Sequence, residues 1–490
     1  MKDDITIWLN LIGDNKDIEK LILHESSADV LIQLKWRTTK KFCPNCGSRM
    51  YSKGYYIRTV SHNVMQDGRN VVLKLVKKKW KCKTCSYFES DKFPFVEDYK
   101  RVTNNVDFLI VQAFKDYNLT ARQIAKQFNV SDTYALQTFD RYVDLDRLPL
   151  PEVLCVDEVN LNIDKYCKYA LVLQDFSSGD AVDILPSRRN NVTEAYFASI
   201  PKKERLKVKY LVSDMFDSYQ TFPTKYFPNA ISIVDSFHVV KLINHKIKIY
   251  MNSLKKEYMR RDKANFDKRQ NESNVKLTYV DSKEVYLLKH EQWLITTNNE
   301  DIHYLSKGHF DKHFGNNLMY PADYEYELFK FFPQLEEIRD LKELYIKFNK
   351  KYVGIPDQAE EELNTIIEIY RDCGYSFFEE VSSTLIKYKQ GILNSFTIMP
   401  KLYNNGKYYE TRLSNGPLES FNRIPKDMKR DSRGYLNFSH LRNRILYSTR
   451  TNAKILANPK PLSEVKIYTG KKRGKYKKHS NNEDNKTNEE

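Results

Sequence analysis

The sequence lacks any apolar run that approaches the roughly 20 residues of a membrane-spanning helix. Its first residues, MKDDITIWLNLIGDNKDIEK, carry acidic side chains where a secretory signal needs basic ones, and no long apolar segment follows them. There is also no internal repeat. These absences argue against membrane, secreted and repeat proteins, and they predict a cytoplasmic protein with no membrane partner.

Cysteine is scarce, and its number is odd. Seven cysteines in a reducing compartment argue against a disulfide framework. Four of them form the pairs Cys43-Pro-Asn-Cys46 and Cys82-Lys-Thr-Cys85. Each two-residue gap lets both thiolates of a pair reach one ion, and two pairs complete a closed tetrahedral site. This spacing predicts a structural Zn²⁺ site, and four thiols that only fill a core are the alternative.

The length and the charge narrow the class of protein. At 490 residues the chain exceeds the roughly 250–300 residues at which a single core stops growing, so we expect two or more domains. Lys and Arg outnumber Asp and Glu by 80 to 64, which leaves a formal charge of +16. Such an excess favours a polyanionic partner, although charge alone does not identify it.

The first half of the chain predicts two small modules. Residues 1–100 contain short alternating apolar stretches around the cysteine pairs and are predicted to form a zinc-binding β module. Residues 101–148 show helical periodicity, and within them Thr120–Ser131 has the pattern of a helix-turn-helix. Thr120 would cap the first helix, Asn129 and Val130 would form the turn, and Ser131 or Asp132 would cap the second helix.

The second helix of this pair is the segment that we expect to contact DNA. Its side chains that would face the DNA are Thr133, Gln137 and Arg141. An ordinary helical hairpin is the alternative. Pro149 and Pro151 then mark a domain boundary.

Residues 153–235 change to short β-rich runs, VLCVD, KYALVLQDF, AVDILP, VKYLVSD and ISIVD, with one helical stretch near residues 192–200. Three strands, a helix and two further strands predict a mixed sheet flanked by helices, the order found in RNase H-like nucleases. Helical periodicity then dominates, so we expect an all-helical insertion at 246–410 between two parts of the α/β domain, 150–245 and 411–452. The predicted fold class is therefore α+β multidomain, ending in a basic, disordered tail at 453–490.

Carboxylates at strand ends are the candidates for chemistry. Asp157 and Asp214 each close an apolar strand, and Glu419 lies in the first turn of a helix beyond the insertion. Mg²⁺ prefers carboxylate oxygens, and two such ions stabilise the attacking and leaving oxygens of a phosphodiester displacement. Spacing alone leaves two alternatives open. A strand-end Asp often only caps a turn, and other acids compete for the role: Glu158, Asp175, Asp183 and Asp217.

Taken together, these motifs resemble the zinc-finger insertion-sequence transposases of the ISL-three family, a branch of the DDE transposases. The resemblance runs from about Cys43 to Arg450. It rests on the cysteine pairs, the helix-turn-helix, the two strand-end Asp residues and the block Ser414-Asn-Gly-Pro-Leu-Glu-Ser-Phe-Asn422, with Lys429-Arg430 and Gly434-Tyr-Leu-Asn-Phe438 after it. It implies that Asp157, Asp214 and Glu419 bind catalytic Mg²⁺ or Mn²⁺.

A further motif, Asp235-Ser-Phe-His238, resembles the (C/D)xxH motif of Mutator-type and hAT-type transposases. That resemblance implies that Asp235 and His238 support the catalytic site or the DNA strand. A satisfied histidine at the start of a helix is the alternative for His238.

Basic residues near these motifs are suited to phosphate contacts, and the Tyr and Phe around many of them are suited to base stacking. Solvated helix faces are the alternative. Pro425 would break a helix that runs on from Glu419, which leaves open whether the basic residues after it share that helix. The residues expected to contact DNA are Arg188, Arg189, Asn422, Arg423, Lys426, Lys429, Arg430, Arg433, Arg442 and Arg444.

The sequence thus predicts a transposase that binds terminal inverted repeats and catalyses Mg²⁺-dependent hydrolysis and strand transfer. Its expected partners are the transposon ends, the target DNA and further copies of itself on the DNA, with nucleoid association when bound. Two other classes stay open: a non-catalytic DNA-binding regulator derived from a transposase, and a structure-specific nuclease that does not join strands.

Overall fold

The computed structural model describes residues 18–37, 40–64, 68–163, 167–403, 405–435 and 437–465. The chain forms two compact units, one made of residues 1–146 and 427–490 and the other of residues 147–426. Of the basic tail predicted at 453–490, residues 466–490 lie outside the described residues. The expectation of disorder is wrong for 453–465, because the Leu456 and Lys460 N–H groups donate to the backbone carbonyls of Tyr142 and Arg141 and Leu462–Glu464 forms a 3₁₀ turn. None of the helices in the described ranges combines the length and the apolar character needed to cross a membrane.

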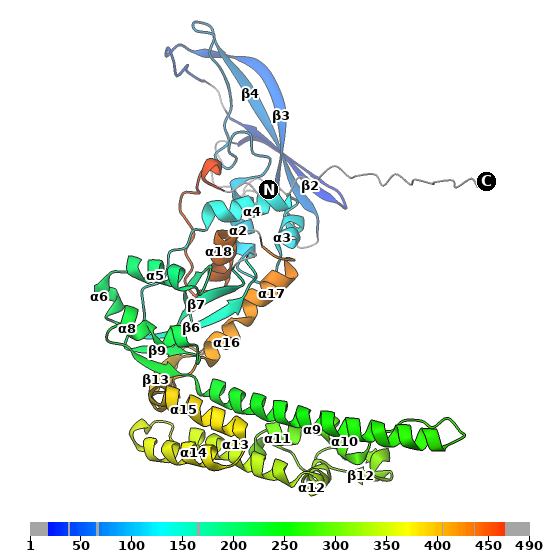
Figure 1. The fold of residues 1–490 in the computed structure, drawn as a ribbon. Helices are drawn as coiled ribbons and strands as arrows, with labels where there is room; N and C mark the ends of the chain where they lie inside the picture. Colours follow the sequence, from blue (N-terminus) through cyan, green and yellow to red (C-terminus); the bar gives the residue numbers. More distant parts are fainter. Residues whose placement is uncertain are drawn as a thin grey trace, which may run out of the picture. The chain divides into compact units, whose positions relative to one another are not determined.

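The first unit contains a five-stranded sheet with the order β1-β2-β4-β3, in which β5 pairs with β4. Side chains of β4 alternate between buried and partly exposed, and Val71, Leu73 and Leu75 fill the core. Trp80 packs beside two of the cysteines in a second, smaller cluster. Figure 1 shows β3 and β4 as a long twisted ribbon. The strands are β1 (Ile18–Glu25), β2 (Asp29–Trp36), β3 (Met50–Val64), β4 (Asn70–Cys82) and β5 (Phe88–Ser90).

Three helices follow in the same unit, and their ends confirm the predicted caps. The Thr120 hydroxyl accepts a hydrogen bond from the Gln123 N–H at 3.3 Å, as half of a capping box. The Ser131 hydroxyl accepts one from the Tyr134 N–H at 3.1 Å. Between them Asn129 has a φ of +52°, as the turn requires. The helices are α2 (Asn104–Ala113), α3 (Ala121–Gln127) and α4 (Asp132–Tyr142).

Helix α18 (Phe438–Thr449) belongs to this first unit and packs through a buried arginine. Arg444 is only 2% exposed, and its guanidinium donates to the backbone carbonyls of Phe114, Asp116 and Leu119. This placement corrects the expectation that Arg444 contacts DNA phosphate, because its donors are already satisfied inside the fold. The periodic basic residues of this stretch do not reveal which of them is buried.

The second unit contains the sheet predicted from residues 153–235, with the order β10-β9-β6-β7-β8. Strands β6, β9 and β10 are parallel, whereas β7 and β8 are antiparallel to their neighbours. One face of the sheet buries Leu154 and Val156 against aromatic side chains such as Phe197. The elements are β6 (Val153–Asn160), β7 (Tyr169–Asp175), β8 (Ala181–Leu185), α5 (Asn190–Ser199), α6 (Lys202–Arg205), β9 (Tyr210–Ser213), α7 (Asp217–Gln220), α8 (Phe222–Tyr226) and β10 (Ile231–Val234).

A mainly helical segment follows β10 (Figure 1). The expectation that it is all-helical is wrong in detail, because it contains two short antiparallel pairs, β11–β12 and β13–β14. Strands of three to five residues carry too little alternation to be recognised in a sequence. The elements are α9 (Ser236–Glu272), α10 (Lys283–His290), α11 (Trp293–Thr296), β11 (His309–Asp311), β12 (Asn317–Met319), α12 (Pro321–Phe331), α13 (Pro333–Lys351), α14 (Glu360–Asp372), α15 (Ser376–Asn394), β13 (Ile398–Leu402) and β14 (Tyr408–Arg412), with the short 3₁₀ turns η2 (Asn299–Asp301), η3 (Lys312–Phe314) and η4 (Pro356–Gln358).

Helix α15 lies directly on β10 at a glycine. A Cβ atom on Gly391 would lie 2.7 Å from Val234 Cγ2 and 3.4 Å from the Val234 backbone nitrogen. The 2.7 Å distance is shorter than real Cβ atoms show, whereas 3.4 Å is an ordinary contact, so the missing side chain permits the close packing of α15 on the Val234 side chain. Val234 immediately precedes Asp235, so this contact supports the position of that acid.

The helix that begins before Glu419 is interrupted, as Pro425 predicts. Helix α16 (Gly416–Phe421) ends, Asn422 forms a turn, and α17 (Arg423–Asp431) follows. Proline has no N–H to donate to the carbonyl four residues earlier, which is that of Phe421, so the break falls there. Four basic residues expected to contact DNA therefore lie on α17 and not on the helix of Glu419: Arg423, Lys426, Lys429 and Arg430.

Candidate metal centres

The four paired cysteines form a compact cluster in the first unit. Their sulfur atoms all lie within 4.8 Å of one another, with Cys43 and Cys85 3.4 Å apart and Cys46 and Cys82 3.5 Å apart. Tetrahedral zinc with Zn–S bonds of about 2.3 Å needs sulfur separations of about 3.8 Å, so the cluster fits this ion after a small expansion. The Ser48 backbone lowers the pKa of the Cys46 thiol to about 6, which favours the thiolate that a metal binds.

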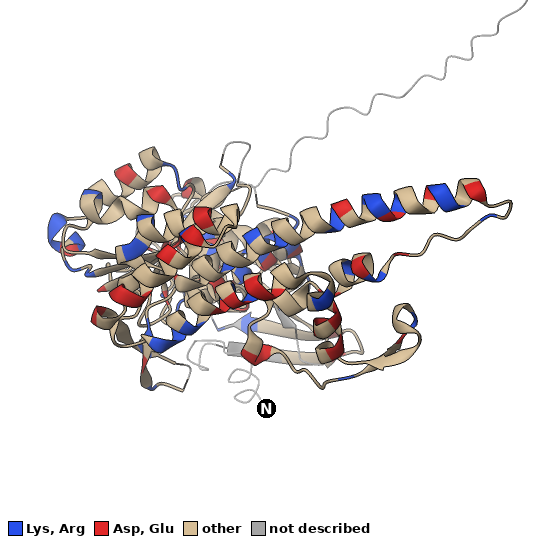
Figure 2. Ribbon diagram, turned by 60° about the horizontal axis from the view of Figure 1, so that its bottom comes forward, with Lys and Arg blue, Asp and Glu red and all other residues tan. Residues whose placement is uncertain are grey.

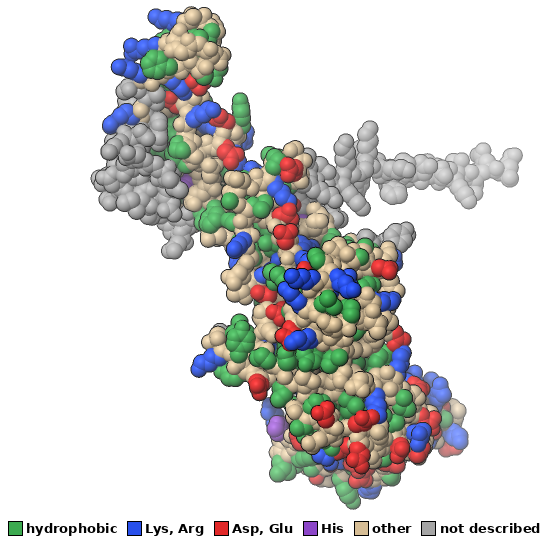
Figure 3. Space-filling model, turned by 90° about the vertical axis from the view of Figure 1, so that its left-hand side faces the viewer, with side chains coloured by type: hydrophobic (Ala, Val, Ile, Leu, Met, Phe, Trp, Pro, Cys, Tyr) green, Lys and Arg blue, Asp and Glu red, His purple; other side chains and the backbone are tan. Residues whose placement is uncertain are grey.

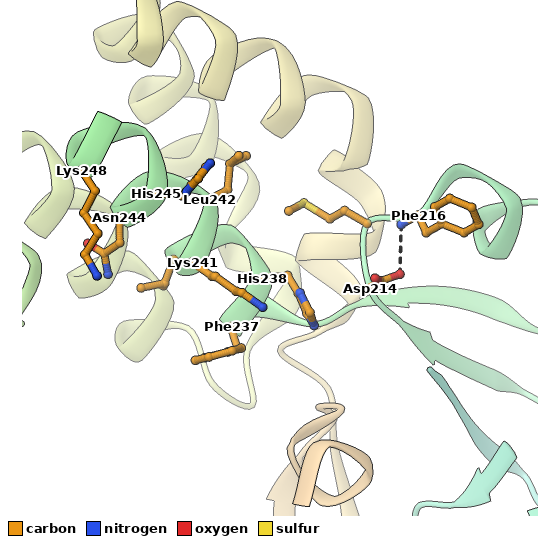
Figure 4. A pocket seen from close by; sticks show the side chains of 11 residues that line it. Asp214, Phe216, Phe237, His238, Lys241, Leu242, Asn244, His245 and Lys248 are labelled. Carbon is orange, nitrogen blue, oxygen red and sulfur yellow. Dashed lines mark hydrogen bonds between the residues drawn. The ribbon is translucent and has the colours of Figure 1, made fainter. Parts of the chain in front are cut away.

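Two acids meet at one edge of the second sheet. Asp157 lies on β6, and Asp214 directly follows the neighbouring parallel strand β9. Asp157 Oδ1 accepts from the Glu158 N–H at 2.8 Å, and Asp214 Oδ1 accepts from the Phe216 N–H at 3.1 Å (Figure 4). Carboxylate oxygens of Asp157, Glu158 and Asp214 lie within 4.8 Å of one another. This is a separation that one divalent cation can bridge.

The third predicted acid reaches the same region from α16. Glu419 Oε1 lies 3.4 Å from His238 Nε2 on α9, and both are grouped with Asp235 within 4.8 Å. Asn415, just before α16, ties this helix to the sheet at two points. Its N–H donates to Asp235 Oδ2 at 3.1 Å, and its Nδ2 donates to the Val156 carbonyl at 3.0 Å. These bonds bring residues more than 170 positions apart to one site.

The carboxylates are close enough to affect one another's protonation. Burial raises the pKa of Asp157 to about 7, and the negative charges of Glu158, Asp214 and Glu419 raise it as well. Burial also raises the pKa of Asp214, together with the charge of Glu158, while His238 opposes this effect. A cluster that resists losing its protons in this way is stabilised in its ionised form by bound cations.

Glu158, the nearest rival acid, already has partners for both oxygens. Its Oε1 lies 2.6 Å from Arg188 Nη1, and its Oε2 accepts from the Tyr219 hydroxyl at 2.8 Å. The Arg188 guanidinium also lies over the rings of Tyr169 and Phe216, which help to hold it beside Glu158. The remaining rivals hold structural contacts: Asp175 with Ser177 and Ser178, Asp183 with Tyr196, and Asp217 with Lys387 and Tyr388.

Asn422 lies in a different environment from the one that the sequence predicts. It is 3% exposed and donates from Nδ2 to Asp157 Oδ2 at 2.8 Å, which corrects the expectation that it contacts DNA. Its Oδ1 is buried without a hydrogen-bond partner among the described residues. A signal was present, because Asn415 and Asn422 stand four positions before and three after Glu419, the spacing of one helical face.

The other residues expected to contact DNA vary in exposure. Thr133, Arg189 and Lys426 are exposed, whereas Gln137 and Lys429 are partly buried. Some of the arginines already donate to the protein: Arg141 to the Lys460 carbonyl at 2.9 Å, Arg442 to the Leu145 carbonyl at 2.7 Å and Arg430 to Asp427 at 3.1 Å. Arg433 is exposed and has a φ of +56°, and Arg423 is exposed on α17. Contact with DNA stays a prediction for these residues.

A zinc cluster followed by a sheet whose edge gathers acids is an arrangement suited to a DNA-processing enzyme. A family model described as a transposase, the DDE type of ISL3, matches residues 154–445. A second model, described as the zinc-finger of transposase IS204/IS1001/IS1096/IS1165, matches residues 40–85. The chain belongs to this ISL3 family of insertion-sequence transposases, and the resemblance read from its motifs is confirmed.

One curated relative is similar to this chain over part of its length. The transposase for insertion sequence element IS1001 of Bordetella parapertussis is 25% identical over 223 residues, which cover 43% of this chain and 52% of that protein. The chain thus spans about half the length of this relative. The zinc-finger match and the four-thiol cluster together support a structural Zn²⁺ site at Cys43, Cys46, Cys82 and Cys85.

Proposed function

We propose that this protein binds the ends of its insertion sequence and cuts and joins DNA with Mg²⁺ held by Asp157, Asp214 and Glu419. The observation that carries the proposal is the convergence of these acids from β6, β9 and α16 on one edge of the sheet. The strand order, with three antiparallel strands first and two parallel strands added on the far side of β6, supports an RNase H-like domain.

DNA-end binding is assigned to the first unit. Helices α3 and α4, with their capped ends and tight turn, support a helix-turn-helix in which Thr133, Gln137 and Arg141 belong to the recognition helix. The zinc module adds a basic surface along β3 and β4, where lysines lie over tyrosine rings. Figure 3 shows Lys and Arg side chains gathered on the zinc module. Lys53 on β3 and Lys83 just after β4 lie over the Tyr51 ring, and Lys79 on β4 lies over the Tyr56 ring. Such a surface is suited to phosphate contacts that fix the protein on the duplex.

The chemistry needs two displacements at phosphorus. Water first adds to the phosphorus at the transposon end, and the bond to the 3′ oxygen breaks, which frees a 3′-hydroxyl. That hydroxyl then adds to a phosphorus of the target strand and displaces the 3′ oxygen of the target, so one phosphodiester replaces another. When bound, Mg²⁺ would stabilise the charge on the attacking and leaving oxygens. No covalent bond to the protein is required.

The chain's own residues hold the acids in position for both steps. Asn422 orients Asp157, and the Phe216 N–H orients Asp214. Asp235 and Asn415 anchor the start of α16, so that Glu419 stays at the sheet edge beside His238. Supporting residues of this kind affect metal affinity and rate by about 10–100-fold in metalloenzymes.

The test is incubation of the purified protein with Mg²⁺ and labelled DNA carrying the element's own ends. Glu419→Gln should abolish both cleavage and joining, while end binding and zinc content are retained. Glu410→Gln is the matched control, because Glu410 is an exposed acid on β14. If wild-type protein binds the ends without cutting them, the alternative of a non-catalytic DNA-binding regulator is correct. If it cuts the DNA without joining strands, the alternative of a structure-specific nuclease is correct.

A further inference from the structure

A groove runs from the acids along the first turns of α9. Its volume is about 720 Å³, and Asp214 and Phe216 form one end of it. Figure 4 shows the other wall, where side chains of α9 project from successive turns toward the groove. The whole groove lies within the second unit. Among the α9 residues that line it, only His238 has a role implied by the sequence motifs.

The α9 wall carries a row of basic and imidazole side chains. His238, Lys241, His245 and Lys248 follow one another at intervals of three, four and three residues, which places them on one face of the helix. We call these four residues the cation row. Within the described part of the chain, Lys241, His245 and Lys248 are exposed and have no carboxylate within 4 Å, whereas Lys246, on another face, pairs with Glu380.

The composition of α9 changes along its length. From Ser236 to Lys256 there is no Asp or Glu, and the first acid is Glu257. Farther along, acidic and basic residues are interspersed, as Figure 2 shows on the projecting end of this helix. Stabilising ion pairs on a helix need an opposite charge three or four positions away, and the first half of α9 offers none, so the cation row does not stabilise the helix in this way.

The dimensions of the row suit a nucleic-acid strand. With a rise of about 1.5 Å per residue, His238 and Lys248 are about 15 Å apart along the helix axis, a length that corresponds to about four base-pair steps of 3.4 Å along the axis of a DNA duplex. Phe237, at the end of the groove near the acids, is 52% exposed and offers a ring face to a base. Asn244 also lines the groove, and its buried Oδ1 has no hydrogen-bond partner among the described residues.

We propose that the cation row holds the phosphate backbone of the DNA strand being cut and guides its reacting phosphate to Asp214 and Glu419. The proposal rests on the function proposed above and identifies a substrate contact of that same site. Because the row lies in the unit that carries the acids, it would act on strand positioning separately from end binding by α3 and α4. The ligand is a DNA strand, and the contact is electrostatic and independent of base sequence.

The test compares two double variants of the full-length protein. Lys241→Gln with Lys248→Gln removes two charges from the cation row. Lys263→Gln with Lys268→Gln removes two charges from exposed positions farther along the same helix. Binding of end-containing DNA with flanking sequence is measured over a salt series, and the single-turnover cleavage rate is measured at low protein concentration.

The row variant should lower the slope of log affinity against log salt by about 2, since each lost phosphate contact changes it by about 0.9. Its cleavage rate should fall about tenfold or more, while the control variant keeps the wild-type slope and rate. Equal behaviour of the two variants would overturn the proposal. If wild-type protein binds but never cuts, the proposed function fails and the salt slope still decides the role of the row. If it binds no DNA, both fail.

Discussion

The two candidate metal centres of this protein are built in opposite ways. The thiol cluster, Cys43, Cys46, Cys82 and Cys85, takes its four sulfur atoms from two short knuckles of one small sheet. The acid cluster, Asp157, Asp214 and Glu419, draws on β6, the end of β9 and α16, which are up to about 260 residues apart. Beside it, buried oxygen atoms of Asn415 and Asn422 have no hydrogen-bond partner among the described residues. A closed thiolate site suits a structural ion, whereas an open carboxylate site leaves room for substrate.

The two clusters differ in whether local sequence or contacts between distant segments determine their geometry. Two residues between paired cysteines already place both sulfurs near one ion, so the local chain determines the zinc site. The acids depend on the pairing of β6 with β9 and on the anchoring of α16 by Asn415. Damage to the first centre should therefore stay within its module, whereas the second should respond to changes in its supporting residues.

The largest effect is expected at the acid cluster. Asp214→Asn should lower the Mg²⁺-dependent cleavage rate at least about 1000-fold, because a divalent ion loses one of its few charged ligands. Asp217→Asn, three residues on, is the control and should change the rate less than tenfold, since the Asp217 carboxylate is already paired with Lys387 and Tyr388. Single-turnover cleavage measures both, and an active Asp214→Asn variant would refute the assignment.

A substitution in the thiol cluster should affect zinc content and DNA-end binding and leave Mg²⁺ binding unchanged. Cys82→Ser should release zinc and unfold the β3–β4 module, because structural zinc supplies much of the folding energy of such modules. End binding should fall about 100-fold, while Mg²⁺ binding to the second unit is unchanged. Cys373→Ser, in the second unit, should retain zinc. Metal analysis and binding measurements test this, and loss of Mg²⁺ binding in Cys82→Ser would break the comparison.

A smaller effect is expected from the support of Asp157. Asn422→Ala removes the donor to Asp157 Oδ2 and should lower the cleavage rate or Mg²⁺ affinity by about 10–100-fold. Asn422→Gln, with a longer side chain, should not restore the rate, because the amide no longer meets the oxygen at the same place. A Mg²⁺ titration of the cleavage rate separates affinity from rate. Wild-type behaviour of Asn422→Ala would make Asn422 a packing residue only.

The smallest effect concerns the stability of the metal-free protein. The folded pKa of Asp157, about 7, lies above its ordinary value of 3.8, so the folded state binds this proton more tightly than the unfolded chain. The resulting stabilisation is complete below pH 4 and is lost as the pH rises through about 7. In chelator at pH 8, Asp157→Asn should therefore raise the free energy of unfolding, on the order of 1–3 kcal/mol.

Thermal unfolding from pH 4 to pH 8 checks this sign. With Mg²⁺ the wild-type protein should instead be more stable than Asp157→Asn, because it gains stability from a ligand that the variant binds poorly. A variant that is less stable than wild type in chelator at pH 8 would contradict the electrostatic account of the acid cluster.

Much of the architecture was predictable because its signals are local. The five strands of the second sheet were found from apolar runs, and the caps at Thr120 and Ser131 from the residue types that accept backbone N–H groups. The two cysteine pairs were grouped correctly by spacing. The choice among acids came from the family resemblance, and the roles of Asp157, Asp214 and Glu419 stay predictions.

What the sequence could not provide depends on contacts between distant segments. Nothing local shows that Arg444 lies buried under three carbonyls or that Glu158 is neutralised by Arg188 and Tyr219. Asn422 looked like a surface residue because a polar amide next to basic residues usually is one. Burial of a polar group becomes favourable only through a partner, and that partner comes from another part of the chain.

Gly391 shows that an empty position can matter as much as a contact. The strand that leads to Asp235 lies where it does because no methyl group projects from α15 at that point. Any added Cβ atom at this position would meet the Val234 side chain at 2.7 Å. A gain of one carbon atom, about 155 residues away in the sequence, therefore forces a shift in the packing beside the acid cluster.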